Sequence, residues 1–294
     1  MSSESVQAER HKLWVRRLLL LVVAFLLAPG NGTTTEKIVY NPVSQEIIER
    51  RLGNFKRDNR QRENVLLEMF RESGCDDKHL SEQHVSGMKL SNVVCVLPGG
   101  SNRSVIVGAH YDHVSAGDGV VDNWSGASLL PSLYEAIRVE PRKHTYIFIG
   151  FAAEEDGELG SRFYALHMSK EQVAATDAMV NMDTLGLGPT QMWLEQADKR
   201  LASALAYLGK AMGAPVGATN IGQVGSTDSV QFSERNIPSI TIHTLDQKTW
   251  DANVLHSKQD TIDVIHKDEY YQTYRLVAAY IAYLDGLSGN KSAH

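Results

Sequence analysis

Two features of the sequence predict an α/β fold, arranged as a three-layer α/β/α sandwich around a central mixed, mostly parallel sheet. The first is a series of almost continuous apolar runs, such as "SVIVGA" at residues 104–109. Strands of this kind are typical of a sheet that is buried on both faces. The second feature is that segments with helical spacing alternate with these runs, which favours helices on both faces of one sheet.

The N-terminus has the pattern of a secretory leader. An apolar run covers residues 18–27 and the small residues "APGNG" follow it. Four basic residues precede the run: Arg10, Lys12, Arg16 and Arg17. This order is typical of a signal peptide, and the run is shorter than the ~20 residues of a membrane span. We therefore interpret residues 1–30 as a signal peptide of a secreted or periplasmic protein. The alternative is an uncleaved N-terminal anchor, and only then do we expect contact with a membrane.

The remaining chain is predicted to form a single domain over residues 44–288, after a polar linker at 31–43 and before a tail at 289–294. Residues 44–73 have helical spacing with a break near Gly53, and we interpret their charged faces as solvated surface. The apolar runs predict strands at 92–97, 104–109, 145–153, 178–183, 192–196 and 239–244. Helical spacing predicts helices at 125–138, 160–168, 198–212, 228–235 and 267–287.

Composition excludes some classes of function. The net charge is −6 over 294 residues, so the chain lacks the basic footprint of a nucleic-acid-binding protein, and we expect no nucleic-acid partner. Cys75 and Cys95 are too few for a cysteine-rich zinc site. They form either one disulfide, if the chain is exported, or two buried thiols. The sequence carries no visible signal of the oligomeric state.

Acidic and imidazole side chains follow several of the predicted strands. Ligands bind beyond the carboxyl ends of the strands in open α/β sheets, so we expect these side chains to converge in one crevice. They are His110, Asp112, Glu154, Glu155, Asp183 and His256.

Such a group requires a cation, because buried carboxylates are paired or bind metal. Oxygen and imidazole ligands without thiolate suit zinc, with cobalt or manganese as substitutes. His110 and Asp112 stand two residues apart and share a face, so we expect the Asp112 carboxylate to accept a hydrogen bond from the ring nitrogen that does not bind metal. Glu154 and Glu155 are adjacent and diverge, so one can bind a metal while the other takes a proton from water.

Six motifs occur in order along residues 90–285: "GAHYDH" (108–113), "DNWSGAS" (122–128), "FAAEEDGELGS" (151–161), "VNMDTLG" (180–186), "STDSVQF…IPSI" (226–240) and "LHSKQDT" (255–261). Their order and approximate spacing resemble those of the co-catalytic dizinc aminopeptidases of metallopeptidase family twenty-eight. Relatives of that family include glutamate carboxypeptidases, glutaminyl cyclases and the inert transferrin receptor. The resemblance implies a zinc aminopeptidase-like fold and makes residues 44–288 a dizinc peptidase catalytic domain.

Carried over position by position, the resemblance implies a pair of zinc ions. His110 and Asp183 would bind one ion, and Glu155 and His256 would bind the other. Asp122 would bridge the two, as a loop carboxylate placed between ions that lie ~3.5–4 Å apart.

The resemblance also implies roles beside the metal ligands. Glu154 matches the general base of the family, and Asp112 is the second residue that we place in the catalytic machinery. Thr227 occupies the position of a hydroxyl that supports the last histidine. This chain reads Thr-Asp-Ser there, where Ser-Asp-His is more usual.

Other polar residues receive plainer interpretations. We expect His113, Asp118 and Asp156 to be solvent-facing loop charges, because the site already has its ligands and base. His243, on an apolar strand, is interpreted as a core histidine with satisfied hydrogen bonds, and contact with substrate is the alternative. The chain has no G-x-S-x-G and no H-E-x-x-H pattern, which argues against a serine hydrolase or a helix-borne zinc peptidase.

These observations predict a secreted zinc exopeptidase that removes N-terminal residues from peptides with a free N-terminus. Two alternatives keep the same site: a glutaminyl-peptide cyclase, and a carboxypeptidase or dipeptidase specificity. A third is an inert receptor-like binding domain, which predicts eroded ligands, whereas this chain retains all five ligands and the base.

Overall fold

The structure is a computed structural model that describes residues 21–24, 37–220 and 225–287. Its strands are β1 Leu21–Ala24, β2 Lys37–Tyr40, β3 Leu80–His84, β4 Ser91–Leu97, β5 Ser104–His110, β6 Thr145–Phe151, β7 Thr176–Met182, β8 Gln191–Trp193, β9 Gly217–Thr219 and β10 Ser239–His243. Its α-helices are α2 Gln45–Leu52, α3 Asn59–Glu72, α4 Ser125–Ala127, α5 Leu130–Ile137, α6 Leu159–His167, α7 Lys170–Ala175, α8 Lys199–Ala211, α9 Ser229–Ser233, α10 Gln247–Asp251 and α11 Lys267–Leu284. A turn, η1, covers Val120–Trp124, and the backbone of Asp122 and Asn123 within it is not helical.

Eight of these strands form one mixed sheet in the order β3-β4-β6-β5-β7-β10-β8-β9. The four central strands, β6, β5, β7 and β10, run parallel to one another. The strands β3, β4 and β8 join the sheet through antiparallel pairings. The carboxyl ends of the central strands therefore lie together at one edge of the sheet, where the predicted site residues follow them.

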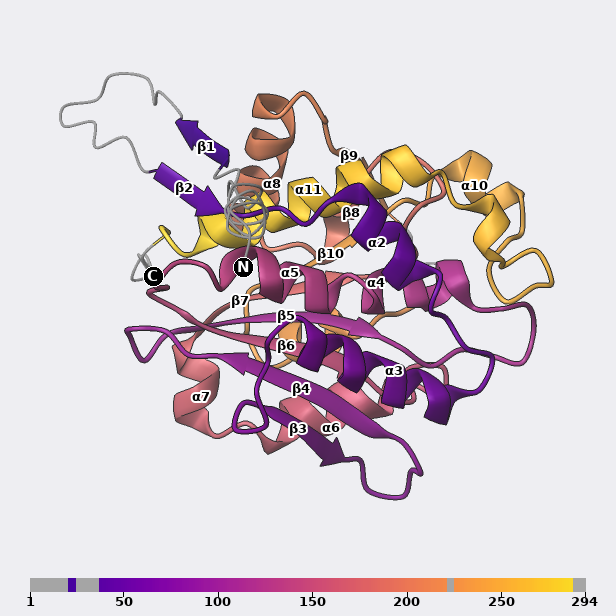
Figure 1. Ribbon diagram of the computed structural model, residues 1–294, viewed down its shortest axis with the longest axis horizontal. Helices are drawn as coiled ribbons and strands as arrows, with labels where there is room; N and C mark the ends of the chain where they lie inside the picture. The colour runs from indigo at the N-terminus through magenta and orange to yellow at the C-terminus, as the bar shows by residue number, and fades with distance from the viewer. Residues whose placement is uncertain (1–20, 25–36, 221–224, 288–294) are drawn as a thin grey trace, which may run out of the picture.

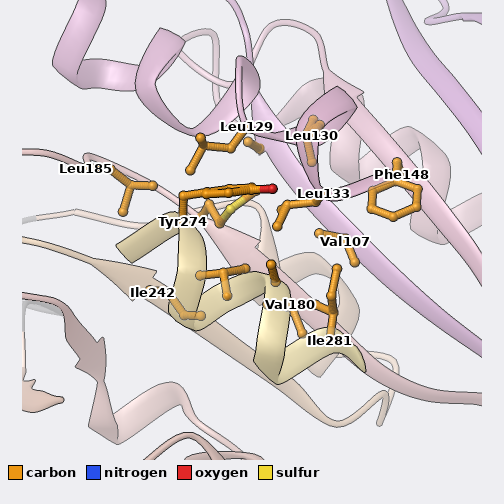
Figure 2. Close-up of a cluster of buried hydrophobic side chains, with 14 of the residues drawn as sticks. Val107, Leu129, Leu130, Leu133, Phe148, Val180, Leu185, Ile242, Tyr274 and Ile281 are labelled. Carbon is orange, nitrogen blue, oxygen red and sulfur yellow. The ribbon is translucent and has the colours of Figure 1, made fainter. Parts of the chain in front are cut away.

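Helices cover both faces of the sheet, and each face has its own core. Val105 and Val107 of β5 lie in the larger core, whereas Ile106 between them lies in the smaller one, because successive side chains of a strand point to opposite faces. In Figure 1, α2, α5 and α11 lie above the sheet and α6 and α7 lie below it. Figure 2 shows where strands meet α5 and α11 in the larger core, through Val107, Phe148, Val180, Ile242, Leu130, Leu133, Tyr274 and Ile281. The predicted layered α/β fold is confirmed.

Several local predictions need correction. The helix expected at 125–138 is divided into α4 and α5. Within the expected linker at 31–43, the strand β2 forms, and Ile38, Tyr40 and Val43 are buried in the larger core, so this part is packed against the domain. The charged faces of residues 44–73 are not all solvated, because Arg62 and Glu63 are completely buried. Of the two alternatives left open for Cys75 and Cys95, the structure contains the disulfide.

Most of the predicted leader and the whole predicted tail lie outside the described residues. Of residues 1–30, the structure describes the strand β1, which pairs antiparallel with β2. Among the described residues, no helix combines the length and the apolar character that crossing a membrane requires. The proposed domain boundaries at 30, 43 and 288 stay predictions.

Candidate metal centre

Three neighbouring strands deliver the first group of candidate ligands. His110 is the last residue of β5, Asp183 directly follows β7, and Glu154 and Glu155 follow β6 by a few residues. Because β6, β5 and β7 are adjacent and parallel, these side chains meet at the same edge of the sheet. His256 reaches them from the loop between α10 and α11.

The Asp122 carboxylate stands between two imidazoles. Its Oδ1 lies 3.2 Å from Nε2 of His110, and its Oδ2 lies 3.2 Å from Nε2 of His256. On the first side, Asp183 Oδ1 lies 3.7 Å from the same nitrogen of His110. On the second side, Glu155 Oε2 lies 2.9 Å from Nε2 of His256. The ligand atoms thus form two triads that share Asp122, each spanning less than 4.8 Å.

The loop that carries Asp122 is fixed by a residue that sequence reasoning did not single out. The Asp260 carboxylate accepts hydrogen bonds from the main-chain N–H groups of Val121 and Asp122, at 2.7 and 3.1 Å. Gly126 allows a close approach on the other side, since a Cβ atom there would lie 2.7 Å from the carbonyl oxygen of Met182. Asp260 belongs to the motif "LHSKQDT", but its role depends on a partner 138 residues away in the chain, which no local pattern reveals.

The electrostatics of the site follow from burial and from the crowding of charges. Burial alone would raise the pKa of Asp122, but hydrogen bonds with His110 and His256 outweigh it and hold that pKa below its ordinary value. Burial raises the pKa of Glu154 to about 10, and the Asp228 and Asp183 carboxylates add to this shift. A bound cation would lower the raised pKa of Glu154 again.

The Asp112 carboxylate has a different partner from the one predicted. Its Oδ1 lies 3.8 Å from Nδ1 of His110, which is too long for a hydrogen bond. That ring nitrogen instead lies 3.2 Å from the main-chain carbonyl oxygen of Asp112. The carboxylate accepts the main-chain N–H groups of Glu154 and Glu155, at 3.1 and 3.2 Å. Asp112 therefore orients the pair of glutamates, and the His110 ring is oriented by a carbonyl.

Comparison with protein families decides where the chain belongs. Residues 92–281 match the profile described as "Peptidase family M28", which is more than half of the chain. The chain belongs to peptidase family M28.

Curated relatives of this M28 chain are longer than it is. It is 29% identical over 181 residues to aminopeptidase YwaD of Bacillus subtilis, covering 60% of this chain and 40% of that protein. It is 27% identical over 228 residues to leucine aminopeptidase 2 of Arthroderma otae, covering 67% and 46%. The M28 chain thus spans less than half the length of these two relatives.

Solved structures show similar folds. A zinc aminopeptidase from Bacillus subtilis superposes on the M28 chain with a TM-score of 0.61 and 25% identity, covering 70% of this chain and 52% of the other. The LapA aminopeptidase of Legionella pneumophila superposes with a TM-score of 0.65 and 22% identity, covering 85% of this chain and 78% of the other. A glutaminyl cyclase of Porphyromonas gingivalis superposes with a TM-score of 0.66 and 17% identity, covering 82% of this chain and 96% of the other. At these last two identities, the likeness concerns the fold alone.

A cavity of about 350 Å³ opens beside the two triads of the M28 chain. His243 lines it, contrary to the prediction of a satisfied core histidine. Its Nδ1 accepts the main-chain N–H of Leu245 at 3.0 Å, so the ring proton is on Nε2, which is buried without a hydrogen-bond partner among the described residues. Trp193 also lines the cavity, and its indole N–H has no hydrogen-bond partner in the part of the chain that the structure describes, a feature that sequence reasoning missed.

The three residues expected to face solvent differ in environment. Asp156 is exposed as predicted. His113 is buried, and its Nε2 donates to the carbonyl oxygen of Arg57 at 3.0 Å. The Asp118 side chain is only 13% exposed and pairs with Arg57 at 2.6 Å. The residues just before α3 thus cover a loop that local sequence indicates as exposed.

The hydroxyl of Thr227 also differs from its predicted role. It donates to Oδ2 of Asp183 at 2.7 Å, so it supports that carboxylate and not the last histidine, His256.

Proposed function

We propose that this chain is a zinc-dependent aminopeptidase whose two zinc ions share Asp122. One observation carries the proposal: Asp122 offers one oxygen to each of two triads, in a chain of family M28. His110 and Asp183 would complete the ligands of the first ion, and Glu155 and His256 those of the second. Two relatives, aminopeptidase YwaD and a zinc aminopeptidase from Bacillus subtilis, support the same activity.

The residues present fit zinc. Imidazole and carboxylate ligands, with the only two cysteines joined in a disulfide away from the site, suit zinc or the neighbouring ions cobalt and manganese. In addition, Oε1 of Glu155 is buried and has no hydrogen-bond partner within the described part of the chain. A bound cation would satisfy this oxygen, since buried charges are paired or bind metal.

The side chains around the triads suit peptide hydrolysis. Zinc ions, when bound, supply Lewis acidity that polarises a carbonyl oxygen and lowers the pKa of water. Glu154 lines the cavity, and its Oε2 lies 3.8 Å from Nε2 of His110. In the proposed reaction, Glu154 takes a proton from the attacking water and then gives it to the leaving amine as the peptide bond breaks. Asp112 holds Glu154 in place through its main-chain N–H.

The cavity suits the first residue of a peptide. Its wall combines apolar side chains, Leu245, Trp250 and Leu255, with the carboxylates of Glu154 and Glu158. The carboxylates favour a free, positively charged amine, while the apolar wall can accept the first side chain. We propose peptides with a free N-terminus as substrates.

Export of the protein is part of the proposal. The leader pattern at residues 1–30 supports secretion or a periplasmic location, with an N-terminal anchor as the alternative. The Cys75–Cys95 disulfide supports it independently, because disulfides persist mainly in oxidising compartments.

A panel of aminoacyl reporters, each free and N-acetylated, tests the activity. We expect hydrolysis of the free-amine forms only, loss of activity with a chelator, and recovery with zinc. Hydrolysis of acetylated reporters at equal rates would contradict an aminopeptidase. Loss of ammonia from a glutaminyl peptide, without release of glutamine, would indicate a cyclase instead.

A further inference from the structure

Arg62 of α3 is a completely buried cation whose role the proposed chemistry does not explain. Its side chain is 0% exposed, yet it takes part in none of the ion pairs of the described residues. Its guanidinium donates instead to main-chain carbonyl oxygens, those of Lys56 at 2.6 Å, Tyr111 at 3.1 Å, Gly119 at 3.0 Å, and Asp118. A buried charge satisfied in this way is costly, which argues that it has a specific task.

Three of these carbonyls belong to the loop between β5 and η1, which leads from His110 to Asp122. Asp260 also holds this loop, because its main-chain oxygen accepts the N–H of Asp118 at 2.7 Å and its carboxylate accepts the N–H of Asp122. The Arg62 guanidinium also lies 5.6 Å from the ring centroid of Trp124, at the end of η1. The loop that leads to Asp122 is therefore held by hydrogen bonds from both a buried arginine and a buried aspartate.

The start of α3 holds the same loop through a second residue. The Asn59 side chain accepts the main-chain N–H of His113 at 3.2 Å and donates to its carbonyl oxygen at 3.1 Å. Both Asn59 and Arg62 lie outside residues 92–281, the segment that matches the family profile. A helix outside the matched segment thus fixes a loop that carries a proposed metal ligand.

We propose that Arg62 is a positioning residue that sets the metal affinity of the centre by fixing the loop at residues 111–122. The fork of N–H donors of a guanidinium can hold several carbonyls at once, whereas a lysine ammonium has no such geometry. Without the guanidinium hydrogen bonds of Arg62, the Asp122 carboxylate would be less well positioned to take part in both triads. The proposal rests on the proposed metal centre, but it does not depend on the reaction that the centre catalyses.

Zinc affinity of the full chain, measured by competition with a chelator at a temperature where every variant is folded, tests the proposal. Arg62→Lys keeps the charge and loses the fork. Removal of residues that orient metal ligands typically costs 10–100-fold in affinity, and we expect Arg62→Lys to weaken zinc binding by about that factor. Arg51→Lys is the matched control, because Arg51 is also buried but bonds to Ser132, Ser73 and Glu135, away from the loop. We expect its zinc affinity to stay within about twofold of wild type.

Each other outcome decides against the proposal. A zinc affinity of Arg62→Lys equal to that of wild type would overturn it, even if the variant melts at a lower temperature. Tighter zinc binding by Arg62→Met would show that the charge of Arg62 dominates and would overturn it as well. If no Arg62 variant folds, Asn59→Ala replaces them, and unchanged zinc affinity there would be the contrary result. Failure of wild type to bind zinc would refute the proposed function itself, which keeps the two failures distinguishable.

Discussion

Thr227 donates its hydroxyl hydrogen to Oδ2 of Asp183 at 2.7 Å, while Oδ1 of the same carboxylate faces Nε2 of His110. The Thr227 oxygen in turn accepts a hydrogen bond from the Asn181 side chain at 2.7 Å. Hydrogen bonds from Asn181 through Thr227 therefore hold Oδ2 of Asp183, while Oδ1 accepts a hydrogen bond from the Thr184 hydroxyl at 3.1 Å. The Thr-Asp-Ser sequence of this chain keeps a hydroxyl where it is needed.

Replacing Thr227 with valine should weaken zinc binding. Valine has the same shape but removes the hydrogen bond to Oδ2 of Asp183, and hydrogen bonds to charged groups contribute about 1.5–3 kcal/mol. We expect the affinity for zinc to fall about 10-fold or more, as measured by chelator competition. Thr227→Ser retains the hydroxyl and should bind zinc nearly as wild type does. Equal affinities for the valine and serine variants would show that the hydroxyl is irrelevant.

Replacing Glu154 with glutamine should separate catalysis from metal binding. Glutamine cannot accept the proton of water, so we expect kcat to fall about 10²–10⁴-fold. The zinc content should be unchanged if the ions occupy the two triads that share Asp122, because Glu154 belongs only to a third group, with His110 and Glu155. Activity and elemental analysis on the same sample measure both effects, with Asp156→Asn on the exposed neighbour as the control. Full activity of Glu154→Gln would exclude it as the base.

The stability of the chain without and with zinc should depend on pH in opposite directions. Without zinc, the hydrogen bond to Asp122 raises the pKa of His256 to about 9, and burial raises the pKa of Glu155 to about 7. Both folded pKa values lie above the ordinary ones, so the stability that these groups contribute is present at low pH and is lost as pH rises through 7 and 9. The pKa of Asp122 is lowered, so the stability that Asp122 contributes is lost as pH falls, but only at pH values more acidic than these.

Zinc reverses the trend because protons compete with it for His256 and Glu155. Thermal midpoints should be measured with chelator and with excess zinc, from about pH 5.5 to about pH 8.5. We expect the thermal midpoint of the chelated protein to fall as pH rises. The difference between the midpoints with zinc and with chelator should become larger over the same range. If zinc raised the thermal midpoint by the same amount at every pH, this would argue against His256 and Glu155 as ligands.

The Cys75–Cys95 disulfide should contribute to stability and leave the chemistry unchanged. It closes a loop over 20 residues of sequence between the end of α3 and β4, and a loop of this size is worth about 3 kcal/mol. The double variant Cys75→Ser/Cys95→Ser should therefore melt lower, by about 2–4 °C for each kcal/mol. Its kcat/KM at a temperature where it is folded should match that of wild type. An unchanged melting temperature would show that the bond carries no stability.

The sequence predicts best what depends on local pattern. The strands β4 to β7 and β10 are continuous apolar runs, and they appear close to where that pattern places them. The segments β3 and α7 were not predicted, because β3 has only Leu80 buried and α7 buries no residue. Without an apolar periodicity, such edge elements have no signal to detect.

The candidate site also contains residues that the sequence predicts and residues that only the fold reveals. His110 and Asp183 can be predicted from their place at strand ends. The proposal that Asp122 bridges two ions came only from the family resemblance. Arg62 and Asp260 could not be found from the sequence, because an arginine on a charged helix and an aspartate in a loop look like solvated residues. Their partners in the loop at residues 111–122 lie 49 or more residues away in the chain, so only the fold brings them together.

Crystals grown with zinc and measured at the zinc absorption edge test the central claim most directly. We predict two anomalous peaks about 3.5–4 Å apart, with one oxygen of Asp122 bound to each, and no such pair of peaks in crystals of Asp122→Ala. A single peak at full zinc occupancy, or two peaks that do not share Asp122, would contradict the account.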